Sequence, residues 1–334
     1  MLPALAAVPR AGNTAQERRM DKLRTTVEEQ RRRMEAHLHA PLTRIAQRLT
    51  EAWPNREALD RVLLDGIREL PECTFLYALN TDGIQISDNI SHDGLLTEHF
   101  GRDRSQRPYM KEVVPADGFL LSEAFISLLG RRPCMTALQL IRDPDGQVLG
   151  FMGADFDLRN LPDSNILYEE STEWRQIKGD PSIRGTVFLQ SRVESALDRD
   201  IDAVISVLEE LITERGVFQC VLHFSSSRAT VWTLDDPYRY RILTQDALGD
   251  PDTCLAFPKR TYPENGLVPA DAIGPILDTL KGLRFADETV YLRSASINLF
   301  NGMISLTFSC DGSHYMTWKE FLDRSLDFWL GNTP

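Results

Sequence analysis

The chain has 334 residues, of which 42% are hydrophobic and 26% are charged, and its formal net charge is −12. This length allows about two domains, each with its own core, and the composition is that of a folded soluble protein rather than a disordered one. The negative net charge argues against a broad electrostatic surface for nucleic acid, so no nucleic-acid partner is expected.

The N-terminal residues and the cysteines bear on the cellular compartment of the protein. Residues 1–13 are rich in Ala, Pro and Gly and are expected to be disordered, without the basic region and long apolar stretch of a secretion signal. No later window approaches the ~20 apolar residues of a membrane helix, so no membrane partner is expected. The cysteines, at positions 73, 134, 220, 254 and 310, follow no pattern, which is typical of free thiols in a reducing compartment. We therefore expect a cytoplasmic protein.

A long helix is expected to begin at the capping box Thr14-Ala-Gln-Glu17 and to end near residue 50, with a kink or restart at Pro41. At ~1.5 Å per residue it spans about 55 Å, more than the length of an ordinary strand, so part of it should overhang any sheet it covers. An overhanging apolar stripe needs a partner, which predicts a homodimer through this N-terminal helix. The alternative is that the stripe packs on the chain's own sheet. The stripe consists of Leu23, Val27, Met34, Leu38, Leu42, Ile45 and Leu49.

A second helix is expected after Pro54-Asn55, and strand-length runs with alternating apolar positions follow it. The first two runs, 74–79 and 84–87, form a hairpin, and an irregular excursion around Gly101–Met110 comes next. The remaining runs form a three-stranded meander at 119–126, 133–143 and 147–158, and Asp-Gly turns join two of the strand pairs.

Three segments of this region resemble, in order and spacing, the PDC/Cache ligand-sensing domains, which are relatives of the PAS fold. Tyr77–Gly83 resembles the opening hairpin, Arg104–Tyr109 the R-P-W/Y element of the binding face, and Asp143–Asp155 the closing hairpin with its G-x-D ending. The resemblance covers roughly the first half of the chain. It implies that residues 14–160 form a Cache-like antiparallel sheet domain preceded by helices.

The resemblance also implies a small-molecule site between the sheet and the excursion. Arg107 would hold a carboxylate through two parallel hydrogen bonds, with Tyr109 beside it. Asp155 would balance a ligand amine or accept from hydroxyls. The apolar walls would be formed by Tyr77, Phe125 and Met135.

Two departures from the family's pattern bear on the ligand. Relatives that bind amino acids have tryptophan and tyrosine where this chain has Tyr109 and Met110, so the expected ligand is a small molecule with a carboxylate or an amine. The alternative for the arginines of the excursion is surface pairing with neighbours such as Asp103 or Glu112, which stabilises a fold little.

The second half of the chain is expected to be another α+β domain. Residues 161–190 are expected to be a linker, and residues 191–334 a domain that begins with a helix at the capping box Ser191-Arg-Val-Glu194. Five strand-like runs, a proline-broken helix and a final helix follow, with an Asn301-Gly302 hairpin. The order of elements is similar to a PAS-like plan, and the whole chain is predicted to be α+β.

No catalytic residue, metal or cofactor is predicted. Cys310-Asp-Gly-Ser-His314 matches the core of an iron–sulfur motif, but the further cysteines that a cluster needs are missing upstream. The leading hypothesis is a cytoplasmic, non-enzymatic ligand sensor that acts through an unknown effector protein.

Two alternatives stay open. One is an enzyme that uses the Asp235-Asp236 turn and the turn at 310–314, and the other is a structural interaction protein with a vestigial pocket. Clustered acids and bases with shifted pKa values in the second domain would favour the enzyme, and a sealed first domain would favour the structural protein.

Overall fold

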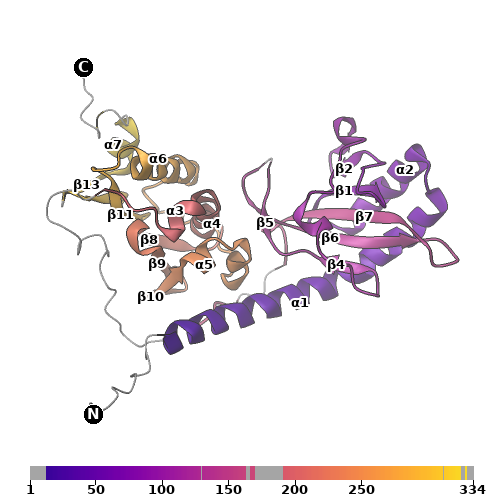
Figure 1. Cartoon of the computed structure of the whole chain (residues 1–334), viewed down its shortest axis with the longest axis horizontal. Helices are drawn as coiled ribbons and strands as arrows, with labels where there is room; N and C mark the ends of the chain where they lie inside the picture. The colour runs from indigo at the N-terminus through magenta and orange to yellow at the C-terminus, as the bar shows by residue number, and fades with distance from the viewer. Residues whose placement is uncertain are drawn as a thin grey trace, which may run out of the picture.

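The computed structural model describes residues 13–128, 130–162, 166–169, 191–310, 312–324 and 328. It contains two antiparallel sheets that lie side by side, each with its own helices, and one long helix that runs beneath both (Figure 1). Residues 1–12 of the expected disordered terminus and 170–190 of the expected linker lie outside the described residues. Among the described residues, no helix is long and apolar enough to span a bilayer.

The first sheet has the order β3-β2-β1-β7-β6-β4, and β5 pairs with β6. The first strand therefore lies at the centre beside the last one, and the excursion between β3 and β4 contains the short 3-10 helices η2 (Thr97–His99) and η3 (Pro108–Met110). The strands are β1 (Cys73–Asn80), β2 (Asn89–Ser91), β3 (Gly94–Leu96), β4 (Phe119–Leu121), β5 (Phe125–Ile126), β6 (Pro133–Arg142) and β7 (Val148–Asp157).

Helices α1 (Asn13–Ala52) and α2 (Arg56–Gly66), with η1 (Ile67–Glu69) after them, pack on one face of this sheet. α1 continues through Pro41, so the expected restart does not occur. α2 begins where Asn55 accepts a hydrogen bond from the Ala58 N–H, a side-chain cap that a helix start requires. The other face of the sheet carries the candidate site.

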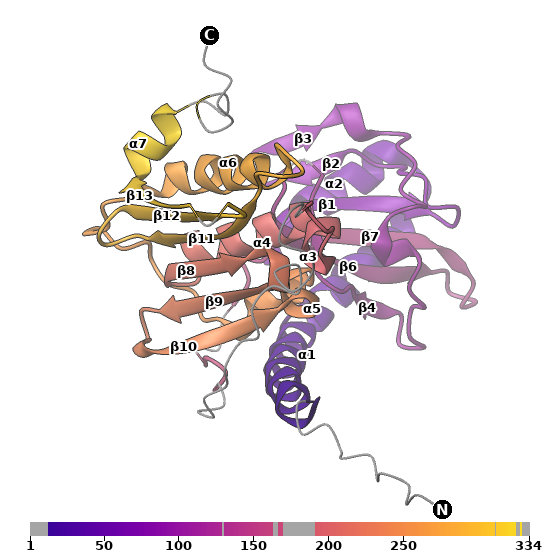
Figure 2. The same ribbon diagram turned by 60° about the vertical axis from the view of Figure 1, so that its left-hand side comes forward.

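The second sheet has the order β10-β9-β8-β11-β12-β13 (Figure 2). The predicted α+β class is confirmed. In the first sheet the last strand, β7, lies beside the first strand, β1. In the second sheet β11, the first strand after the helical excursion, lies beside β8, and the last strand, β13, lies at the edge. The two halves therefore differ in strand order, and the expected PAS-like plan does not hold for the second domain. The strands are β8 (Val217–His223), β9 (Arg228–Thr233), β10 (Asp236–Thr244), β11 (Leu292–Asn298), β12 (Met303–Phe308) and β13 (Ser313–Thr317).

In the second domain, α4 packs against α6, and both helices contact the sheet. They are α3 (Ala196–Arg199), α4 (Ile201–Thr213), α5 (Gln245–Leu248), α6 (Ile273–Phe285) and α7 (Trp318–Asp323), with the 3-10 helices η5 (Phe224–Ser226), η6 (Pro251–Ala256) and η7 (Ala270–Ala272).

The overhanging part of α1 is covered by the second domain. α1 lies against η6 of the second domain. Arg31 of α1 places its Nη1 3.2 Å from Asp252 Oδ1 of η6, and its Nη2 donates to the Leu121 carbonyl at the end of β4. Leu23 and Met34 are consequently only 5% and 4% exposed. The argument that an uncovered apolar stripe on this helix requires a second copy of the chain is therefore wrong. The homodimer itself stays a prediction.

Candidate functional site

A cavity of about 360 Å³ lies between the helix-free face of the first sheet and the excursion. Its lining comes from β1, β2, β6 and β7, from segment 102–109 and from the loop after β5, so segments far apart in the chain meet there. The lining residues are Thr74, Phe75, Asn89, Arg102, Arg104, Arg107, Tyr109, Phe125, Ser127, Leu128, Gly130, Arg132, Cys134, Asp155, Phe156, Asp157 and Arg159.

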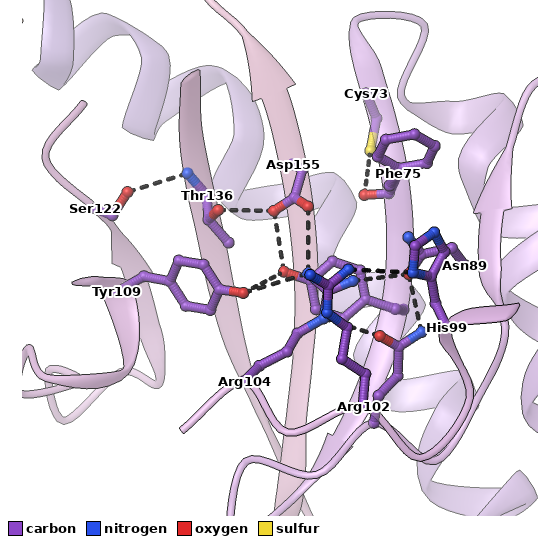
Figure 3. Close-up of polar contacts among 12 residues, drawn as sticks. Cys73, Phe75, Asn89, His99, Arg102, Arg104, Tyr109, Ser122, Thr136 and Asp155 are labelled. Carbon is purple, nitrogen blue, oxygen red and sulfur yellow. Dashed lines mark hydrogen bonds and ion pairs between the residues drawn. The ribbon is translucent and has the colours of Figure 1, made fainter. Parts of the chain in front are cut away.

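Arg104 is the most buried of the arginines that line the cavity, with 5% of the residue exposed. Figure 3 shows its side chain and its polar contacts. Its Nε donates to Gln85 Oε1 at 2.8 Å and its Nη2 donates to Asn89 Oδ1 at 3.0 Å. The guanidinium lies over the Tyr77 ring, 3.8 Å from the ring centre, where the ring quadrupole attracts the cation. Fixed on all sides, this side chain serves as part of the wall.

Asp155 is the carboxylate at the centre of the same network. Its Oδ1 accepts from Thr136 Oγ1 at 2.7 Å and from the Tyr77 hydroxyl at 2.9 Å, and its Oδ2 lies 3.6 Å from Arg104 Nη1. Burial raises the pKa of Asp155, and the nearby Arg104 charge and the two hydroxyl donors act in the opposite direction. Oδ1 is thus engaged by two donors within the protein, whereas Oδ2 has the ion pair with Arg104.

A glycine makes the position of the Tyr77 ring possible. Gly153 of β7 pairs with Tyr77 of β1, and a Cβ at residue 153 would lie 2.4 Å from the ring. The absence of a Cβ at residue 153 makes room for the ring, whose hydroxyl donates to Asp155 at 2.9 Å and lies 3.1 Å from the Tyr109 hydroxyl, from which it can accept. Burial, first of all, raises the pKa of both tyrosines, which keeps them as neutral hydroxyls.

Arg107 differs from Arg104 in that its charge acts on Asp155 only from a distance, where it opposes the burial that raises the pKa of that carboxyl. It lines the cavity and is half-buried, and its side chain has no hydrogen bond or ion pair with any residue that the structure describes. A partly desolvated guanidinium of this kind offers its donors to an anion entering the cavity.

The remaining charges of the lining leave it positive. The cavity is lined by five arginines and two aspartates. Arg159 binds Asp157, with Nη2 2.6 Å from Oδ2, and Arg102 contacts His99 Nδ1 at 3.2 Å. After the Arg104–Asp155 and Arg159–Asp157 pairs are counted, Arg132 still faces Glu210 and Glu214 of the second domain, and Arg102 and Arg107 remain without an ion pair among the described residues.

Four of the six predicted site residues line the cavity, namely Arg107, Tyr109, Phe125 and Asp155. Tyr77 is fully buried behind this lining, under Arg104. Met135 does not line the cavity: it is fully buried in the core on the helix side of the sheet.

The misplacement of Met135 has a cause in the hairpin register. Next to the turn, Arg142 pairs with Val148, and an unbroken hairpin in that register would put Met135 opposite Asp155. A bulge after Ile141 shifts the pairing by one residue, so Thr136 lies opposite Asp155 and Met135 turns to the other face. Thr136, together with Gln85 and Asn89, was missed by the sequence prediction, and Arg104 appeared in it only as the first residue of the R-P-Y element.

The two turns considered for an enzyme in the second domain lie at opposite edges of its sheet, one beside β10 and the other beside β13. Asp235 accepts from Arg260 Nη2 at 2.7 Å, and Asp236 Oδ2 lies 3.6 Å from Arg241 Nη2. Cys310 is exposed, and Asp311 of the same turn lies outside the described residues. In the part of the chain that the structure describes, no cluster of three His, Cys, Asp or Glu side chains could hold a metal ion.

No family model and no curated protein matches the chain. Solved structures that are similar to it are sensory domains. They include the ligand-binding domain of the Campylobacter jejuni chemoreceptor Tlp3 in complex with 4-methylisoleucine, at 15% identity and a TM-score of 0.33 over 46% of this chain and 64% of that one. An extracellular ligand-binding receptor from Desulfohalobium retbaense matches at 14% identity and a TM-score of 0.34, over 44% of this chain and 26% of that one.

A third structure is the ligand-binding domain of the Pseudomonas aeruginosa amino acid chemoreceptor PctC in complex with GABA, at 18% identity and a TM-score of 0.31, over 44% of this chain and 62% of that one. The chain thus spans less than two thirds of each of these proteins. The predicted resemblance to ligand-sensing domains of the Cache type agrees with these similarities. At TM-scores below 0.5 the likeness carries nothing about the ligand, and the function proposed below rests on the cavity itself.

Proposed function

We propose that this protein is a cytoplasmic sensor that binds a small organic anion in the cavity beside Arg107 and acts through a partner protein rather than by catalysis. The observation that carries the proposal is the half-buried guanidinium of Arg107 in the cavity lining, which has no hydrogen bond or ion pair with any residue that the structure describes. A carboxylate can accept two parallel hydrogen bonds from such a group. The apolar side chains Phe75, Phe125 and Leu128 would then contact the body of the ligand.

The state of Asp155 narrows the ligand class. An amino acid would need a carboxylate for its ammonium group, but the oxygens of Asp155 already face Thr136, Tyr77 and Arg104. The other aspartate of the lining, Asp157, is bound by Arg159. We therefore propose an organic acid without an ammonium group, because an ammonium would have to share the Asp155 carboxylate with Arg104 and would enter a cavity lined by five arginines and two aspartates.

The proposed compartment is supported by the thiols. All five cysteines are free, and Cys310 is exposed, which is ordinary in a reducing compartment.

The test uses pairs of acids that differ only in an ammonium group: succinate and aspartate, 4-methylpentanoate and leucine, butyrate and 4-aminobutyrate. Calorimetric titration of the full chain should show at least one acid binding about tenfold or more tightly than its amino partner, since a tenfold ratio requires only about 1.4 kcal/mol. Binding of the amino partners alone would overturn the ligand class. No binding by any of the six compounds would overturn the sensor proposal.

A further inference from the structure

Two arginines of the cavity lining also face the second domain. Arg132 follows the loop after β5, and Arg159 follows β7. Arg132 Nη1 lies 3.8 Å from Glu214 Oε1 and 3.9 Å from Glu210 Oε2, and Arg159 Nη1 lies 3.9 Å from the same Glu214 oxygen. Glu210 belongs to α4 and Glu214 follows its last residue. The same guanidinium groups thus belong to the cavity and to the domain contact.

These contacts are ion pairs without good hydrogen bonds. All three distances exceed the 2.7–2.9 Å of a charge-assisted hydrogen bond. Arg132 Nη1 and Glu210 Oε2 are both buried and have no hydrogen-bond partner among the described residues. An unsatisfied buried donor is unfavourable, so an anion in the cavity that offers an acceptor at closer range would draw these arginines toward itself.

The contact is also joined to the backbone of the cavity. Arg215, only 3% exposed, places its Nε 3.4 Å from Glu210 Oε1 and donates from Nη2 to the Leu158 carbonyl at 2.9 Å. Leu158 lies between Asp157 and Arg159, which both line the cavity. A rearrangement of the backbone at Arg159 would therefore displace Arg215 and the contact that it makes with Glu210 at the end of α4.

From these shared contacts we infer that an anion in the cavity competes with Glu210 and Glu214 for Arg132 and Arg159, so that ligand binding loosens the docking of the second domain on the first. The inference rests on the proposed function. Because coupling between two equilibria is reciprocal, the factor by which the ligand weakens docking equals the factor by which docking weakens ligand binding. A change that weakens the docking contact should therefore strengthen ligand binding. This gives α4 and the second domain the role of the element that responds to the ligand.

The experiment uses succinate, with 4-methylpentanoate as a second acid, on the full chain. Glu214→Gln removes the carboxylate that both arginines face, and Glu209→Gln, five residues earlier on α4, removes an equal charge that forms no ion pair with either arginine in the described structure. Titration should show the acid binding about 5- to 10-fold more tightly to Glu214→Gln than to the wild type, and within about 2-fold of the wild type for Glu209→Gln. Hydrogen exchange at the end of α4 should speed up when the acid saturates the wild type, and less so in Glu214→Gln.

Equal affinity for the wild type and both variants, or slower exchange of α4 with ligand, would overturn this inference and leave the proposed function standing. An equal gain in both variants would show a general charge effect and would also overturn it. Failure of both acids to bind any of the three proteins would overturn the inference together with the proposed function.

Discussion

The guanidinium of Arg104 and the carboxylate of Asp155 face each other in the cavity wall, with Nη1 3.6 Å from Oδ2, and both are held by further partners. Gln85 and Asn89 fix the arginine, and Thr136 and Tyr77 fix the aspartate. The pair therefore contributes to the architecture of the site, and the cation available to a ligand is Arg107, three residues further along the same segment.

Arg104→Ala should destabilise the protein strongly. It would leave Asp155 buried without its nearest opposite charge, and it would remove the donor that binds the side-chain oxygens of Gln85 and Asn89. Breaking one side of a buried pair typically costs about 3–5 kcal/mol, which urea unfolding would measure. The double variant Arg104→Ala with Asp155→Asn should lose less than the two single losses added together. Additive losses would show that the two residues do not act as a pair.

Arg107→Ala should have the opposite profile. Because its side chain has no partner among the described residues, the free energy of unfolding should change by less than about 0.5 kcal/mol. Binding of the organic acid should weaken by about 10- to 100-fold, since hydrogen bonds to charged groups contribute about 1.5–3 kcal/mol. Arg107→Lys should also bind weakly, because an ammonium cannot form the two parallel bonds.

The matched control for Arg107 is Arg68→Ala, whose exposed side chain pairs only with Asp65 on the helix side. It should change neither stability nor binding. An Arg107→Ala protein that binds the acid as well as the wild type does would remove Arg107 from the site.

Gly153→Ala should displace the Tyr77 ring, since the added methyl group would lie 2.4 Å from it. Overpacking of this kind costs about 1–3 kcal/mol, and here it also disturbs the hydroxyl that donates to Asp155. Gly130→Ala is the control, because a Cβ there would meet nothing within 4 Å. Thermal unfolding of both variants should separate them, and equal melting temperatures would contradict the packing described.

Glu210 should make the protein less stable as the pH rises through the acid range. Burial raises the pKa of Glu210 to about 7, against an ordinary value of 4.5, and Arg215 opposes the shift. Between these two values the folded state binds more protons than the unfolded state, so stability falls with rising pH, by at most about 3 kcal/mol for this group.

Glu210→Gln cannot lose a proton, so its stability relative to the wild type should improve between pH 5 and pH 8. Urea unfolding at several pH values measures this, with Glu209→Gln as the control that keeps the wild-type profile. A relative stability of Glu210→Gln that stays constant over this range would show that Glu210 is not held protonated by burial.

Met34→Ala should act within one chain. Met34 is 4% exposed in the continuous core of α1 and the two domains, so its truncation should cost about 2–5 kcal/mol. Sedimentation would show whether the oligomeric state changes too. A change of oligomeric state without loss of stability would restore the intermolecular explanation of the stripe.

Local patterns predicted most of the elements of both sheets, and long-range contacts account for what they missed. The Asn55 cap and the Asn301-Gly302 hairpin depend on neighbours in sequence, so propensity finds them. The bulge after Ile141 follows no residue signal in the strand, and it decides which side chains meet Asp155. The cover of α1 by η6 joins Arg31 to Asp252, which are 221 residues apart, and the length of the helix alone cannot reveal it.

α1 also determines how this chain can be divided. Each sheet folds from its own stretch of sequence, yet one helix supplies apolar surface to both, and the buried residues form a single cluster. A fragment that begins at residue 191 would therefore carry η6 with its α1-covered surface bare, and a fragment that ends at 162 would carry half of α1 uncovered. An exchange of either half for that of another protein would have to preserve the matching helix surface, so α1 ties the two domains into one structural unit.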